Sequence, residues 1–280
     1  MRRYLPLLLA VAACRGEPGE LRDVSDAWPT TQPYDVQEAI RYTETPYADL
    51  PGDSDGIGTL LQDLYPAETP KFAPGDGYVP ANGCEGTEDR QLPMDIEGIV
   101  TLHPRWYMKL SGCNRSDEKY YGNFFIEDST GGIFVAGDSK VAHFDVGDRV
   151  KLRVRAVRTD FDFNMIYAHD VLEISREARP LYYQWSQAGI GKDDIGETRR
   201  VRGVMSTEPD TFGQFTLTTD DGADVFINLD SELNRRRVYP EPGTQLCATG
   251  PVQYSFSEYT IVIMRIGQLA IVEGDEPCPN

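Results

Sequence analysis

Hydrophobic and polar residues alternate with a period of two over most of the chain from residue 94 onwards. The clearest case is RVKLRVRA at 149–156, where Val150, Leu152, Val154 and Ala156 alternate with Arg or Lys. Such alternation is typical of an antiparallel strand with one face in a core and the other in water. The pattern therefore predicts an all-β structure for this part of the chain.

The order of these strand-like segments occurs twice. The first copy reads IEGIVT, GNFFIEDSTGGIFV, VGDRVKLRVRAV and NMIYAHDVLEI, and the second reads VRGVMST, GQFTLTTDDGADVFI, PGTQLCATGPV and YTIVIMRIGQLAIV. Each copy holds five strand-like segments, and a repeat of this size indicates two domains of one kind. We predict a first domain at 94–174, a connector with room for a short helix at 175–198, a second domain at 199–274 and a tail at 275–280.

The N-terminus has the pattern of an export signal. Two arginines precede an apolar run in MRRYLPLLLAVAAC, and the run is too short to span a bilayer as a helix. VAAC resembles the bacterial lipobox, which implies a signal peptide at 1–13 and lipidation of Cys14. Ordinary cleavage after Ala13 is the alternative. Arg15 follows the cysteine, which favours the outer membrane, because Asp at this position favours retention in the inner membrane of enteric bacteria.

Residues 14–93 are rich in Pro, Gly and acids, and we predict an acidic tether there. Between residues 15 and 93 there are 5 Lys or Arg against 16 Asp or Glu, so this segment carries much of the net charge of −18. Two short helices are predicted, because Asp35 and Glu38 have capping-box spacing before AIRY and Asp55 precedes IGTLLQDLY. The pattern leaves open whether they pack on the rest.

The five-strand copies resemble the OB-fold domains of bacterial extracytoplasmic proteins. The residues that carry the resemblance are a Gly in the first strand, the G-x-F-x-(I/L)-x-(D/T)-x-x-G hairpin and the VGDRV entry to the fourth strand; PGTQL replaces VGDRV in the second copy. The resemblance implies two tandem five-stranded barrels in an exported lipoprotein. It places FFIEDSTGGIFV on the second and third strands of the first barrel, with Gly131 and Gly132 in their turn.

The sequence offers little support for catalysis. The three His residues lie far apart and form no metal-binding spacing, and neither a nucleophile elbow nor a P-loop is present. Asp160, Asp162 and Asn164 match the first ligand positions of a calcium loop, but the required Gly and the final Glu are absent. We therefore predict no enzyme activity, no cofactor and no metal site.

A binding role suits the predicted fold better. The OB-fold resemblance implies a ligand surface on strands two and three and on the loops after strands one and four. In the first domain these loops interleave aromatic and basic side chains, which suit stacking and cation–π contacts with a ligand. The alternative is that some of the aromatic rings cover the end of the barrel. The candidate ligand-binding residues are Arg105, Trp106, Tyr107, Lys109, Tyr120, Tyr121, Phe161 and Phe163.

The chain has five cysteines, and four remain for disulfides once Cys14 is assigned to a lipid. Sequence alone allows three pairings of Cys84, Cys113, Cys247 and Cys278, and closure within each domain favours Cys84 with Cys113 and Cys247 with Cys278. An oxidising compartment outside the cytoplasm is compatible with both disulfides.

Together these features predict a non-enzymatic, lipid-anchored envelope protein whose tandem barrels bind or assemble with a protein or glycan. The alternatives are a single-stranded nucleic-acid-binding protein and an accessory domain of hydrolytic machinery. The net charge of −18 opposes nucleic acid, because affinity for polyanions comes mainly from basic side chains that neutralise phosphates.

Overall fold

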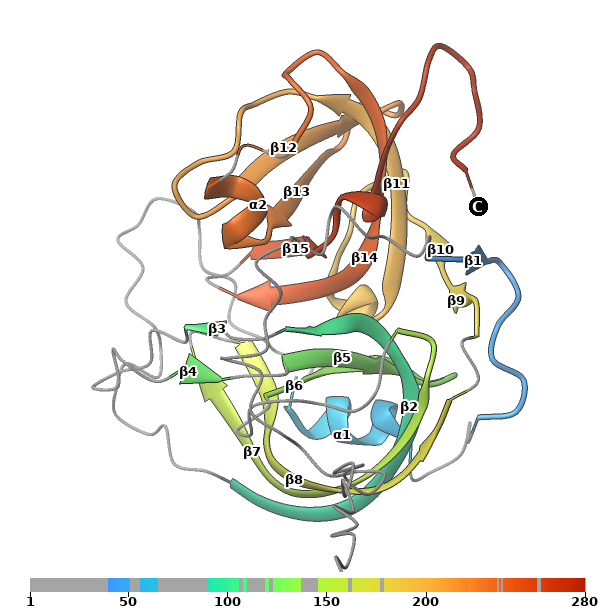
Figure 1. Cartoon of the computed structure of the whole chain (residues 1–280), viewed down its shortest axis with the longest axis vertical. Helices are drawn as coiled ribbons and strands as arrows, with labels where there is room; N and C mark the ends of the chain where they lie inside the picture. Colours follow the sequence, from blue (N-terminus) through green and yellow to red (C-terminus); the bar gives the residue numbers. More distant parts are fainter. Residues whose placement is uncertain are drawn as a thin grey trace, which may run out of the picture.

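The computed structural model shows two β-barrels stacked on each other, with an N-terminal segment against both (Figure 1). The described residues are 40–50, 56–64, 90–105, 108–109, 119–120, 123–136, 146–160, 163–176, 179–235, 237, 239–255 and 258–279. The predicted signal peptide, Cys14 and most of the segment up to residue 89 lie outside them.

Barrel 1 is a closed five-stranded barrel in the order β2-β5-β6-β8-β7. Its strands are β2 (Arg90–Arg105), β5 (Asn123–Glu127), β6 (Gly132–Val135), β7 (Arg149–Asp160) and β8 (Phe163–Ser175). All neighbours pair antiparallel except β6 and β8, which run parallel. A short pair, β3 (Met108–Lys109) and β4 (Lys119–Tyr120), lies in the loop between β2 and β5.

Barrel 2 repeats this strand order. Its strands are β11 (Thr198–Met205), β12 (Gln214–Thr219), β13 (Asp224–Leu229), β14 (Gln245–Ser255) and β15 (Glu258–Ile263). Pairing of β11 with β14 closes the ring, and β10 (Gln184–Trp185) and β16 (Leu269–Ile271) extend its sheet. The predicted fold class, two tandem five-stranded OB-fold-like barrels, is confirmed by this shared topology.

The connector between the barrels is mainly extended. It holds β9 (Leu181–Tyr182), β10 and a three-residue 3-10 helix, η1 (Lys192–Asp194). Barrel 2 carries the helix α2 (Ser231–Arg235) and η2 (Ile266–Gln268), and a disulfide joins Cys247 of β14 to Cys278 with Cα atoms 5.8 Å apart. The predicted pairing of these two cysteines is confirmed, whereas Cys84 and Cys113 lie outside the described residues.

Residues 40–50 form an extended segment that packs on the connector. Ile40 and Arg41 are not helical, and β1 (Tyr42–Thr43) pairs in parallel with β9. The helix predicted to follow the Asp35–Glu38 capping box is therefore wrong at residues 40–42. The pairing with β9 and the burial of Tyr42 outweigh the local capping signal there.

The second predicted helix is present as α1 (Ile57–Leu64), and it closes the interior of barrel 1 (Figure 1). Ile57 and Leu60 are buried in the same apolar cluster as Val100, Phe124 and Ile133. In barrel 2 the corresponding contribution comes from Leu233 of α2. Residues 57–64 of the predicted tether are thus a structural element of the first barrel.

The turn of FFIEDSTGGIFV caps the first turn of α1. The backbone N–H of Ile57 donates to Asp128 Oδ2 at 2.8 Å, and the N–H of Gly58 donates to Thr130 Oγ1 at 2.8 Å. Asp128 Oδ1 accepts hydrogen bonds from the backbone N–H groups of Thr130 and Gly131, which holds the turn in shape. Side chains distant in sequence therefore satisfy helix donors that have no partner within the helix.

Replacement of Asp128 by Ala is expected to lower the free energy of unfolding by about 2 kcal/mol, because buried N–H groups of α1 and of the turn lose their acceptor. Urea denaturation followed by circular dichroism measures the change. Asp275→Ala, at an exposed position near the C-terminus, is the control and should leave stability unchanged. Equal stability of Asp128→Ala and wild type would mean that the turn does not support α1.

Candidate functional site: the barrel junction and the open face of barrel 2

Barrel 2 covers the outer surface of β5, β6 and β8 of barrel 1. Phe125, Phe134 and Phe163 form a buried cluster with Val262 of β15, and Met264 packs against it. The ring centroids of Phe134 and Phe163 lie 4.8 Å apart. This surface includes the strand-two and strand-three face that the OB-fold resemblance implied for ligand binding, so the predicted face of the first domain is unavailable.

Both sides of FFIEDSTGGIFV are consequently buried. Phe124 and Ile126 point into barrel 1, whereas Phe125 and Phe134 point towards barrel 2. Every residue of β5 and β6 is buried. A strand covered on both faces has a continuous apolar sequence, which explains why this stretch lacks the alternation seen at 149–156.

Two glycines allow the backbones of the barrels to touch. A Cβ atom on Gly132 would lie 2.0 Å from the carbonyl oxygen of Gly196, and one on Gly196 would lie 1.7 Å from that of Gly132. Gly131, with φ of 152°, makes the turn, whereas Gly132 is required by this close approach. The sequence pattern predicted both glycines in the turn but did not predict the contact between Gly132 and Gly196.

A buried carboxyl group from barrel 1 joins this contact. Glu127 Oε2 accepts hydrogen bonds from the backbone N–H of Thr198 at 3.2 Å and from its hydroxyl at 2.8 Å. Glu127 is only 2% exposed, and burial raises its pKa from 4.5 to about 8. The nearby Glu197 carboxylate adds to this rise, so the neutral acid is the favoured form at the junction near neutral pH.

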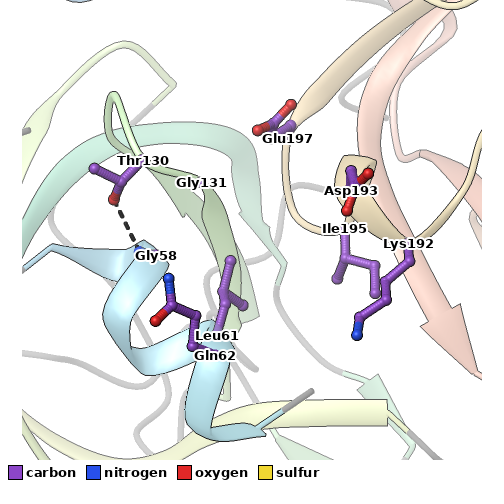
Figure 2. A pocket seen from close by; sticks show the side chains of 9 residues that line it. All are labelled: Gly58, Leu61, Gln62, Thr130, Gly131, Lys192, Asp193, Ile195 and Glu197. Atoms are coloured by element: carbon purple, nitrogen blue, oxygen red, sulfur yellow. Dashed lines mark hydrogen bonds between the residues drawn. The ribbon is translucent and has the colours of Figure 1, made fainter. Parts of the chain in front are cut away.

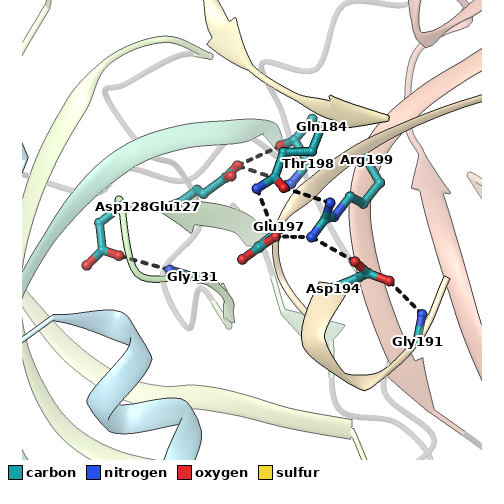
Figure 3. A network of polar contacts seen from close by, with 9 residues as sticks. All are labelled: Glu127, Asp128, Gly131, Gln184, Gly191, Asp194, Glu197, Thr198 and Arg199. Carbon is teal, nitrogen blue, oxygen red and sulfur yellow. Dashed lines mark hydrogen bonds and ion pairs between the residues drawn. The ribbon is translucent and has the colours of Figure 1, made fainter. Parts of the chain in front are cut away.

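The charged groups beside Glu127 form a network around Arg199 (Figure 3). The Arg199 guanidinium donates to the side-chain oxygen of Gln184 at 2.9 Å and pairs with Asp194 at 2.7 Å and with Glu197. Burial raises the pKa of Glu197. Because Arg199 already serves three acceptors, it offsets only part of the cost of ionising Glu127.

An open cleft of about 480 Å³ lies beside this network (Figure 2). Its walls come from three segments: α1, the β5–β6 turn and the connector around η1. The lining residues are Gly58, Leu61, Gln62, Thr130, Gly131, Lys192, Asp193, Ile195 and Glu197. Within the described ranges no group of three or more His, Cys, Asp or Glu side chains is arranged to hold a metal ion.

The N-terminal segment is fastened to the other side of the junction by Arg200. The Arg200 guanidinium carbon lies 3.8 Å from the ring centroid of Tyr183 and 4.9 Å from that of Tyr42. Glu44 accepts hydrogen bonds from the Tyr183 hydroxyl and the Trp185 indole, and these bonds lower its pKa. Residues 40–50 therefore contact barrel 2 through Arg200 of β11, whereas α1 packs into the core of barrel 1.

The outer face of β12 and β13 in barrel 2 remains accessible. Alternate residues of these strands are buried in the barrel core, and the others are partly or fully exposed. We define the open face as these outward side chains together with the loop 206–213; the outward side chains are Gln214, Thr216, Thr218, Asp224, Phe226 and Asn228. Figure 1 shows β12 in the upper part of the molecule, away from barrel 1.

The structure places few of the predicted ligand-binding residues. Phe163 is 6% exposed and packs on Phe134, so its ring is a core residue and not a stacking surface. Arg105, Lys109 and Tyr120 lie in β2, β3 and β4, where the backbone alone is described. Trp106, Tyr107, Tyr121 and Phe161 lie outside the described residues.

The calcium-like pattern has a structural explanation in part. The Asn164 side-chain amide donates to the carbonyl oxygen of Leu64 at 3.1 Å, at the C-terminal end of α1. Asn164 therefore binds the C-terminal end of α1. Asp162 lies outside the described residues.

Comparison with known proteins identifies no family. No family model matches this chain, and no curated protein matches it. A tetrameric p202 HIN2 structure is 11% identical, with a TM-score of 0.29, and covers 68% of this chain and 96% of that chain. The wild-type single-stranded DNA binding protein from Thermus aquaticus is also 11% identical, with a TM-score of 0.25, over 68% of this chain and 98% of that chain. A deletion mutant of the same DNA binding protein is 14% identical, with a TM-score of 0.23, over 67% of this chain and 98% of that chain.

At these TM-scores the comparisons carry no argument about function. The order and pairing of the strands in this chain carry the fold assignment.

The raised pKa of Glu127 predicts a loss of stability with rising pH. The unfolded chain releases the Glu127 proton near pH 4.5, whereas the folded chain holds it until about pH 8, so the free energy of unfolding falls between these values. The slope approaches about 1.4 kcal/mol per pH unit for one such group. Glu127→Gln should flatten this slope, with a residual decline from Glu197. Urea denaturation from pH 5 to 9 measures it.

The matched control is Glu208→Gln, at an exposed position, which should keep the wild-type slope. Identical slopes for Glu127→Gln and wild type would contradict a protonated Glu127 at the junction.

Proposed function

We propose that this chain is a non-enzymatic binding protein of the bacterial cell envelope, anchored by a lipid on Cys14. Its two barrels act as one unit that presents the open face of barrel 2 to a protein or glycan partner. The N-terminal segment up to residue 39 supplies the link from the membrane to this unit.

One observation carries the binding proposal. The two barrels have the same strand order, yet the second and third strands of barrel 1 are buried on both sides, whereas those of barrel 2 are buried on one side only. A sheet face with accessible polar and aromatic side chains is suited to a partner. Barrel 1 and α1 then support the surface that barrel 2 exposes.

A binding role also fits the buried acids at the junction. Glu127 is bonded to Thr198, and Glu197 is bonded to Arg199 and Gln184. Raised carboxyl pKa values are frequent in active sites, but structural networks produce them as well. Here each of these acids joins barrel 1 or the connector to barrel 2, so their contacts support a structural role.

The charge of the open face argues against nucleic acid as the partner. Residues 204–229 contain no Lys or Arg, so the phosphates of a strand laid along β12 and β13 would meet no cation from these elements. Arg202 on β11 is engaged by Asp220 at 3.5 Å. A protein or glycan partner does not require phosphate neutralisation.

The lipid anchor is supported by the sequence alone. VAAC follows an apolar run of signal-peptide length, and Cys14 is the odd member of the five cysteines. The described part of the chain contains no helix with the length and apolar character needed to cross a bilayer.

The open face is tested by photo-crosslinking in the native cells. Benzoylphenylalanine in place of Thr216, at the centre of this face, is expected to form a specific adduct with an envelope component. The matched control places the same group at Arg155, which is exposed on β7 of barrel 1. Equal adduct patterns at the two positions, or none at Thr216, would refute the assignment of the face.

Lipidation requires a separate measurement. Growth with an alkyne-tagged fatty acid is expected to label the wild-type protein, and Cys14→Ser should remove the label because the thioether cannot form. Cys278→Ser, which removes a cysteine of the disulfide with Cys247, is the control and should keep the label. Label that persists in Cys14→Ser would rule out the anchor.

A further inference from the structure

The loop 206–213 presents an aromatic side chain to solvent. Phe212 is 81% exposed, the highest value among the large apolar side chains that the structure describes as exposed. Single exposed apolar residues are common on protein surfaces, so exposure alone identifies no site. The construction of the loop around Phe212 adds the second observation.

Asp210 organises this loop through both its side chain and its backbone. Asp210 Oδ1 accepts hydrogen bonds from the backbone N–H of Phe212 at 2.8 Å and of Gln214 at 2.9 Å. The Asp210 carbonyl oxygen accepts from the Asn234 amide at 2.8 Å, which ties the loop to α2. Gly213 has φ of 90° and approaches Leu229 so closely that a Cβ atom would lie 2.6 Å from its carbonyl oxygen.

Phe212 is therefore held on a preformed loop. An aromatic residue on a fixed loop loses little conformational entropy when a partner covers it, and such residues are frequent energetic centres of interfaces. The loop precedes β12 directly, so Phe212 stands at one end of the open face.

Within residues 204–229 the open face carries charge of one sign only, and the next basic residues along the chain, at the end of α2, include the exposed Arg235 and Arg237. Residues 204–229 hold five carboxylates, all exposed, and no Lys or Arg. These residues are Glu208, Asp210, Asp220, Asp221 and Asp224. Asp210 organises the loop and Asp220 pairs with Arg202, whereas the exposed Glu208 and Asp221 direct their charge to solvent.

The geometry of β12 sets the length of this surface. The six residues of β12 separate Phe212 from the turn that holds Asp220 and Asp221. At about 3.4 Å per residue, β12 alone is roughly 20 Å long, which an extended peptide of six or seven residues can span. Gln214, Thr216 and Thr218 line the path with side chains able to donate or accept hydrogen bonds.

We propose that the open face docks a basic, extended polypeptide segment of a partner protein. Lys or Arg side chains at one end of this segment face the acidic turn, and an apolar or Arg side chain at the other end covers Phe212. This proposal rests on the proposed function, because it names the partner class for the same face.

The charge of the surface favours this occupant over the others. A second copy of this chain is disfavoured, because a molecule with a net charge of −18 repels its own acidic surface. A nucleic acid meets the same repulsion. A neutral glycan gains nothing from the five carboxylates, whereas a cationic segment is attracted and oriented by them.

The test uses random 12-residue peptides displayed on phage and selected against the full protein at low salt. The expected peptides carry a net positive charge, and their binding weakens as salt is raised. Fluorescence anisotropy with the selected peptides should show an affinity loss of about tenfold or more in Phe212→Ala and in the double reversal Glu208→Lys, Asp221→Lys. The matched control, Asp275→Lys with Glu276→Lys, makes the same charge change at exposed C-terminal positions and should bind like wild type.

Several outcomes overturn the proposal. Enrichment of neutral or acidic peptides, equal weakening by both double reversals, full binding by Phe212→Ala, or preferential binding of single-stranded oligonucleotides would each do so. A Thr216 adduct in cells together with non-basic selected peptides would leave the binding face intact and refute only the partner class. Absence of both the adduct and the peptides would refute the face itself.

Discussion

The packing of barrel 2 onto the aromatic outer face of barrel 1 determines the rest of this structure. Phe125, Phe134 and Phe163 would expose a large apolar surface if barrel 1 stood alone, and Val262 belongs to the cluster that removes them from water. Full burial of a Phe side chain is worth about 2 to 3 kcal/mol, so three rings make separation of the barrels costly. The open face follows directly, because only barrel 2 keeps its second and third strands accessible.

Polar groups at the edge of this contact give the junction its specificity. The Gly132–Gly196 contact admits no side chain, and Glu127 reaches Thr198 only when the two backbones meet. Residues 40–50 and α1 add a second connection, since α1 fills barrel 1 and Tyr42 packs on Arg200 of β11. A chain attached to a membrane at its N-terminus would thus hold both barrels through this segment.

The sequence predicted the barrels better than their arrangement. Alternation at 149–156 and the repeated strand order were sufficient for the fold class, because period and order are local properties that a repeat reinforces. The continuous apolar character of FFIEDSTGGIFV carried a further signal: a strand without alternation has both faces covered. That signal could have identified the junction and removed the first barrel's face from the candidate sites.

Other features depend on tertiary contacts that no local pattern contains. Asp128 caps a helix 71 residues away in sequence, and Gly196 has no neighbour in sequence that reveals its contact with Gly132. Phe212 was visible as an aromatic residue in a polar loop, but its significance required the hydrogen bonds of Asp210 and the acidic surroundings of β12. The predicted binding residues lay in the first domain because its loops interleave aromatic and basic side chains, a combination that residues 204–229 lack.

The central claim is that the two barrels form one rigid unit in which barrel 2 covers the outer face of barrel 1. Residual dipolar couplings of backbone N–H groups, measured on the protein in weakly aligned solution, test it directly. We predict that couplings from β5, β6 and β8 and those from β11, β12 and β14 fit a single alignment tensor in the orientation shown in Figure 1. Two tensors of different magnitude or direction would show that the barrels move independently and would contradict this account.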